Sequence, residues 1–164
     1  MMAVQHVDMT GLIDYLSQLL GSRFSRDVAQ IYYGDIMVYL PSSFGGSRKE
    51  QKAIIALSPA YDHVIPESRV ASQESHLLGL DILVMVNITP FFKANPTEAY
   101  GERMLVNLTT AITRFLVQAE NENLGGRVQF AQVSGIDWSW LARDDQAIRA
   151  AGISYECRVR LPRM

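Results

Sequence analysis

The sequence predicts an α+β protein in which a mainly antiparallel sheet carries two helices packed on one face. Apolar side chains recur at helical spacing in two segments, near residues 10–20 and 96–119. The segments between and after them alternate apolar and polar residues, as strands do. Helices separated by sheet in this way favour a helical layer on one sheet face. The expected order of elements is α-β-β-β-β-α-β-β.

The first helix is predicted over Thr10–Leu20. Asp8 or Thr10 can cap its start, and Gly21-Ser22 ends it. Its apolar stripe consists of Leu12, Ile13, Leu16, Leu19 and Leu20. Residues 1–7 are expected to form a flexible arm. Alternation over 29–33 and again over 36–40, on either side of Gly34-Asp35, predicts a hairpin or two short strands.

The middle of the chain is predicted to contain two strands and two long loops. Lys52–Leu57 is a short strand that Ser58-Pro59 ends, and Leu77–Thr89 is the strongest strand pattern. Pro41–Gln51 is polar and contains glycine, and Ala60–Ser75 has scattered charges without periodicity, so both are expected to be loops. Loops of such length in small domains are usually functional or mobile.

The last third of the chain predicts a long helix followed by two strands. Asn95 is placed to cap the helix, Pro96 suits its first position, and Glu98 can complete a capping box. Its apolar stripe is Met104, Leu105, Leu108, Ile112, Phe115, Leu116 and Ala119, and Gly125-Gly126 end it. Strands are expected over Val128–Trp140 and Ile153–Leu161, joined by a connection over Ala142–Gly152.

Composition limits the class of protein. With 164 residues and 48% apolar content, the chain can bury one core, so a single domain over 1–164 is expected. A formal net charge of −2 argues against nucleic-acid binding through bulk positive charge. A single cysteine favours a reducing compartment, and the start of the chain shows no secretory signal. The longest apolar run, Ile82–Val86, is too short to span a membrane.

No catalytic, cofactor or metal site is expected from the motifs. His63 and His76 lie near acidic residues but lack ligand spacing, so a solvated role is favoured over a metal site. Cys157 alternates with Tyr155 and Val159, which predicts a buried thiol rather than a nucleophile. Asp144-Asp145 are expected in a solvated turn.

Trp138 and Trp140 share the parity of Ile136 and so point to one face of a late strand. Large apolar side chains are mostly buried, which favours a core position for at least one of them. The alternative is a contact surface, because aromatic residues are enriched at protein interfaces.

Taken in order, these elements resemble the tail terminator (tail completion) proteins of long-tailed bacteriophages and related contractile tails. The similarity includes the helix Thr10–Leu20, the Pro-ended segment Ala53–Pro59, the strand Leu77–Thr89, the helix start at Asn95-Pro96-Thr97-Glu98 and the closing segment Arg149–Leu161. It extends over nearly the whole chain.

The resemblance implies a structural protein without enzymatic activity or cofactor. Members of that family form six-membered rings that cap the finished tail tube and provide the surface to which the neck or head docks. The expected partners are therefore copies of the same chain, the tail tube and neck or connector proteins, within a virion assembled in the host cytoplasm. DNA is expected to pass through the channel without specific binding, and no membrane is involved.

Candidate contacts with partners or neighbouring subunits come from the loops, from the part-apolar second face of the sheet and from the tryptophans. They are Phe44, Arg48, Lys49, Arg69, Leu83, Met85, Trp138 and Trp140. Two alternatives stay open at this point. One is another connector or head-completion ring, and the other is a small α+β enzyme or ligand-binding domain.

Overall fold

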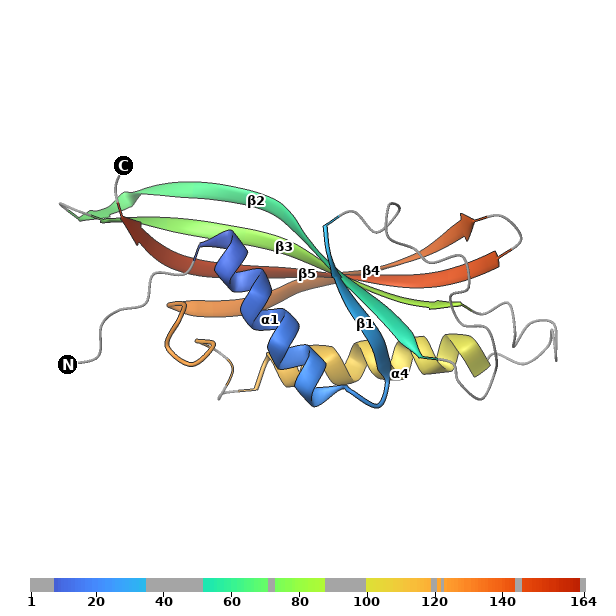
Figure 1. Cartoon of the computed structure of the whole chain (residues 1–164). Helices are drawn as coiled ribbons and strands as arrows, with labels where there is room; N and C mark the ends of the chain where they lie inside the picture. The colour runs from blue at the N-terminus through green and yellow to red at the C-terminus, as the bar shows by residue number, and fades with distance from the viewer. Residues whose placement is uncertain are drawn as a thin grey trace.

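Among the residues that it describes, the computed structural model contains one five-stranded sheet and two helices (Figure 1). It describes residues 8–34, 52–70, 73–87, 100–118, 121, 123–143 and 146–162. The elements are α1 (Met9–Arg23), β1 (Val28–Tyr33), β2 (Ala53–Val70), β3 (Gln73–Asn87), α4 (Tyr100–Leu116), β4 (Phe130–Arg143) and β5 (Gln146–Pro162).

The sheet has the strand order β1-β2-β3-β5-β4. β1 runs parallel to β2, and each of the other neighbouring pairs is antiparallel. Both helices lie on the same side of the sheet in Figure 1. The predicted class, a mainly antiparallel α+β sheet with two helices on one face, is confirmed.

Asp8 caps helix α1, with its Oδ1 accepting a hydrogen bond of 2.8 Å from the Gly11 amide. The helix does not end at Gly21-Ser22 but continues to Arg23. Phe24, just beyond the helix, donates its amide to the Leu20 carbonyl, and both side chains are buried in the core. Burial of these two side chains extends the helix past a glycine that would otherwise weaken it.

Helix α4 carries the predicted apolar stripe. Leu105, Leu108, Ile112, Phe115 and Leu116 are buried, and Met104 packs against the same core. The predicted cap at Asn95-Pro96 and the last stripe residue, Ala119, lie outside the described residues. The helix ends at Leu116 rather than at Gly125-Gly126, because the buried Asn121 amide donates to the Phe115 carbonyl at 2.7 Å and satisfies the end of the helix.

The predicted loop Ala60–Ser75 is instead the tip of a long β-hairpin. β2 continues through Ser58-Pro59 to Val70 and pairs with β3, which begins at Gln73. The register shifts between Pro59 and Tyr61, and a bulge of this kind tolerates a proline that cannot donate a hydrogen bond. Apolar and polar side chains occur on both faces of this segment, which leaves little alternation to recognise, so local periodicity missed the strand.

The last two strands are also longer than predicted. β5 begins at Gln146 rather than Ile153, so most of the expected connection Ala142–Gly152 is strand. Its first half contains Ala147, Ala150, Ala151 and Gly152, whose small side chains leave little alternation to recognise. Asp144-Asp145, the second candidate strand at 36–40, the arm 1–7 and the loop Pro41–Gln51 lie outside the described residues.

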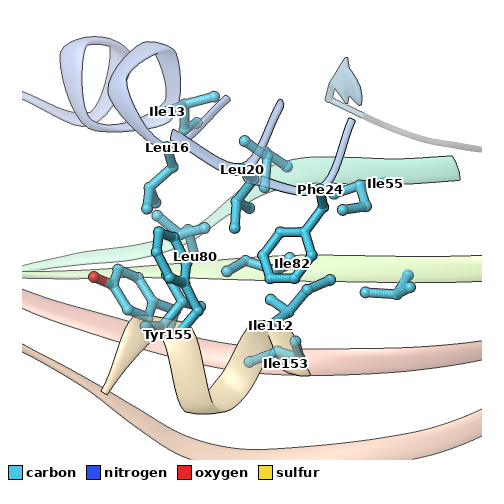
Figure 2. Packing of buried hydrophobic residues seen from close by; sticks show 14 of the residues in the cluster. Ile13, Leu16, Leu20, Phe24, Ile55, Leu80, Ile82, Ile112, Ile153 and Tyr155 are labelled. Carbon is cyan, nitrogen blue, oxygen red and sulfur yellow. The ribbon is translucent and has the colours of Figure 1, made fainter. Parts of the chain in front are cut away.

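The main core fills the space between the helices and the sheet. Figure 2 shows Leu16 and Leu20 of α1, Phe24 just beyond its end and Ile112 of α4 over Leu80, Ile82, Ile153 and Tyr155 of the sheet. The strand side chains alternate into this core, and Cys157 is fully buried among them, as its parity predicted. Burial raises the pKa of the Cys157 thiol to about 12, so the thiol stays protonated and unreactive at neutral pH.

Candidate interaction surface

The side of the sheet away from α1 and α4, here called the outer face, is organised in bands that cross the strands. The cross-strand pairs connect one residue from each strand into a row. One such row on the outer face consists of Gln30, Ile54, Met85, Ala150 and Ser139.

The first band is apolar. Ile54, Ala56, Met85, Ile148 and Ala150 form a small buried cluster separate from the main core, with Tyr32 and Leu83 packed against it. The outer face therefore has a core of its own at this end of the sheet.

A hollow of about 470 Å³ lies next to this apolar band. Asp81 and Asp137 contribute carboxylates, and Ser58 and Ser154 contribute hydroxyl groups. Gly152 is on β5, between the strands β3 and β4 that carry the two carboxylates. The remaining lining residues are Gly34, Ala56 and Leu83. Because glycine and alanine leave space above the backbone, the hollow is a consequence of small residues in adjacent strands.

A polar band follows, made of side chains from β2, β5 and β4. The Tyr61 hydroxyl donates to Glu156 Oε2, and Gln132 Nε2 donates to Glu156 Oε1 at 2.8 Å. The hydrogen bond to Glu156, with burial and the nearby negative charges, raises the pKa of Tyr61 to about 12. The phenol therefore remains a neutral donor. Gly79 lies under the Tyr61 ring, where a Cβ atom would come within 2.3 Å of the ring carbons.

A second polar cluster lies on the helix-bearing side of the sheet, near the hairpin tip. His76 Nδ1 is 2.6 Å from Asp62 Oδ1, and His76 Nε2 is 3.1 Å from Glu74 Oε1. Partial burial acts to lower the pKa of His76, but the hydrogen bonds and charges of the two carboxylates outweigh it and raise the pKa above 6.5. Both ring nitrogens donate only in the imidazolium form. The cluster thus favours a protonated histidine that joins β2 to β3.

The described residues contain no group of three or more His, Cys, Asp or Glu side chains that could hold a metal ion. The described helices also include none with the length and apolar character needed to cross a membrane.

Trp138 and Trp140 lie on β4, at an outer edge of the described sheet, and are 43% and 58% exposed. The prediction that at least one of them is buried is wrong. Parity correctly places them on the same strand face as Ile136, which packs against the main core, but it does not tell how far the helices extend over that face. Arg149 lies with its guanidinium carbon 4.5 Å from the centre of the Trp140 ring and donates to the Ser139 carbonyl at 2.9 Å.

The other predicted contact residues are distributed unevenly. Leu83 is partly exposed at the rim of the hollow, whereas Met85 has no exposed surface and cannot contact a partner in this conformation. Arg69 lies in β2, in a part of the strand whose side chains are outside the description. Phe44, Arg48 and Lys49 lie outside the described residues.

Sequence reasoning missed the hollow and the polar band. Two glycines inside strands, Gly79 and Gly152, were the available signal, because glycine within a strand often marks a close approach of another group. The partner of each glycine lies on another strand, so the signal indicates a position but not the residues that gather there.

A scan of the chain against protein-family models finds no match, and a search among curated proteins finds none either. The fold and the surface by themselves define an α+β protein whose outer sheet face is structured and whose strand β4 exposes two tryptophans.

Proposed function

We propose that this protein is a structural ring protein that caps a phage tail tube and forms the joining surface to the neck or head. The observation that carries the proposal is the pair of exposed tryptophans on an outer strand, with an arginine stacked on one of them. Tryptophan and arginine are the residues most enriched at the energetic centres of protein interfaces. The order of elements resembles that of tail terminators, and this resemblance is the reason for proposing a ring at the end of a tail tube.

The outer face supports the same function through its charge. Asp81 and Asp137 beside the hollow, and Glu156 in the polar band, place three carboxylates in neighbouring rows of one face. A channel lined by such a face would not hold the phosphates of passing DNA. Arg158 and Arg160 lie further along the same face of β5, towards the hairpin tip.

The test has two stages. Mass photometry of the purified chain should show a particle of six copies, each of 18.4 kDa. Electron microscopy should then show this particle at the end of tail tubes that lack their terminating ring. A ring that binds the connector but ignores the tube would instead identify a head-completion or connector protein.

The hollow favours one second candidate, a small ligand-binding domain or enzyme. Its volume of about 470 Å³ is within the range of small-molecule sites, and its two carboxylates would suit a cationic group. A chain that stays monomeric at micromolar concentration and whose melting temperature rises with a small cationic ligand would support this candidate. Asp137→Asn should then abolish the shift.

A further inference from the structure

The two outer strands of the described sheet, β1 and β4, run in opposite directions. β1 is parallel to β2, and three antiparallel pairings separate β2 from β4. A strand at the edge of a sheet presents a row of backbone N–H and C=O groups that can pair with another chain. If β1 of a second copy lies beside β4, the new pair is antiparallel, like most of the sheet.

The two edges also lie at the same level of the sheet. Following the pairs across the strands, Gln30 of β1 is in the same row as Ser139 of β4, and Ile31 is in the same row as Trp138. If matching rows of two neighbouring copies meet, one copy is not shifted along the strand direction relative to the next. Head-to-tail contacts close into a ring when the operation that relates the copies is a rotation without translation.

The part of β4 at this level has few of the features that protect edges. β4 is 14 residues long, and its register irregularity lies between Val133 and Gly135, before the level of β1. From Ile136 to Trp140 the pairing with β5 is regular, and Asp137 is the only charged residue. Long regular edge strands with little charge are those that pair with other strands.

Exposed aromatic side chains occur at both edges and on the same side of the sheet. Tyr33 pairs with the inward-facing Leu57 of the main core and is 48% exposed, and Trp138 and Trp140 occupy the same side at the other edge. In a pairing that keeps the rows aligned, Tyr33 of one copy lies diagonally across from Trp138 of the next. Aromatic side chains in diagonal positions are close enough to contact each other.

We propose that β4 of one copy pairs antiparallel with β1 of the next copy, in the register that aligns Ser139 with Gln30. The sheet then continues from copy to copy around the ring, and Trp138 and Trp140 are covered by the neighbour. This inference rests on the proposed ring function and specifies its subunit contact.

Thiol cross-linking tests the contact directly. Gln30→Cys and Ser139→Cys place thiols on the outer face in one row, where residues directly opposite have Cβ atoms about 5 Å apart. The native Cys157 is buried, and its raised pKa keeps the thiol unreactive, so we expect no cross-links from it. A short bismaleimide allows for a register shift of one row.

The double variant should give a series of cross-linked species up to the closed ring, read on a denaturing gel. A mixture of the two single variants should give two-chain products only, and each single variant alone should give none. Cross-linked dimers from Ser139→Cys alone would show a two-fold β4–β4 contact and overturn the proposal. Particles of ring mass without cross-links would overturn the edge contact while leaving the ring function intact. Monomers alone would overturn both.

Substitution of the tryptophans provides an independent measurement. Trp138→Lys together with Trp140→Lys should raise the ring dissociation constant by more than about tenfold, because the edge loses its central contacts and gains two charges. Val64→Lys is the matched control, since Val64 is 42% exposed on an interior strand. The proposal would be contradicted if Val64→Lys weakened the ring as much as the double tryptophan variant, or if the double tryptophan variant did not weaken it at all. Unchanged circular dichroism would show that each variant is folded.

Discussion

At the scale of single residues, the most unusual arrangement is the histidine held between two carboxylates. His76 contacts Asp62 on β2 through one ring nitrogen and Glu74 on its own strand through the other. Because the pKa of His76 is raised in the folded protein, protonation and folding favour each other. The stabilisation is complete below the unfolded pKa of about 6.5 and is lost as the pH rises through the folded pKa.

We therefore expect the free energy of unfolding to fall as the pH rises above about 6.5, and His76→Gln to remove most of that dependence. Urea unfolding at a series of pH values between 5.5 and 9 measures it. His63→Gln is the control, since His63 is an exposed histidine on the same hairpin that stacks on Tyr61. If His76→Gln keeps the full slope of the wild type, the pH dependence arises elsewhere.

At the scale of elements, an aromatic pair connects α4 to the end of α1. Phe115 of α4 meets Phe24, at the end of α1, edge to face with ring centres 5.6 Å apart. The guanidinium carbon of Arg23 lies 5.9 Å from the centre of the Phe24 ring and 5.7 Å from the centre of the Phe115 ring. The helices are thus joined to each other as well as to the sheet.

Phe115→Ala should lower the free energy of unfolding by about 3–5 kcal/mol, because it removes a buried ring and leaves a cavity between the helices. Chemical denaturation measures the loss. Val106→Ala on the exposed side of the same helix should change it by about 0.5 kcal/mol or less. Equal stability of Phe115→Ala and wild type would mean that the ring does not pack as the structure shows.

At the scale of the whole molecule, the sheet has two different faces. One carries the helices and the main core, and the other carries the apolar band, the hollow and the polar band. Six copies, each with a formal charge of −2, carry −12 in total. A protein of this charge would repel rather than attract a polyanion at long range.

The assembled protein should therefore bind duplex DNA weakly, with a dissociation constant well above 1 μM at physiological salt. A gel-shift series at increasing salt measures this, because tight binding through many phosphate contacts falls steeply with salt. Sub-micromolar, strongly salt-dependent affinity would instead support a nucleic-acid-binding function. Arg158 and Arg160 on the outer face would then be the first residues to replace.

The amino-acid sequence by itself determined the fold class, both helices and the inward faces of the strands. These follow from local spacing: the stripe of α4, the alternation of Tyr155, Cys157 and Val159, and the cap at Asp8 all depend on residues a few positions apart. An apolar stripe can be buried in only a few arrangements of helices and strands, so local spacing is sufficient to predict the fold class and the buried faces.

Only the tertiary structure decided where the strands end and which residues share a surface. Residues 60–70 are strand because β3 lies beside them, and the first half of β5 is strand because its small residues fit between β3 and β4. The exposure of Trp138 and Trp140 depends on how far the helices extend over the sheet. The hollow at Asp81 and Asp137 requires the alignment of residues 56 positions apart. Such pairings are set by contacts between distant segments, which no local pattern in the chain contains.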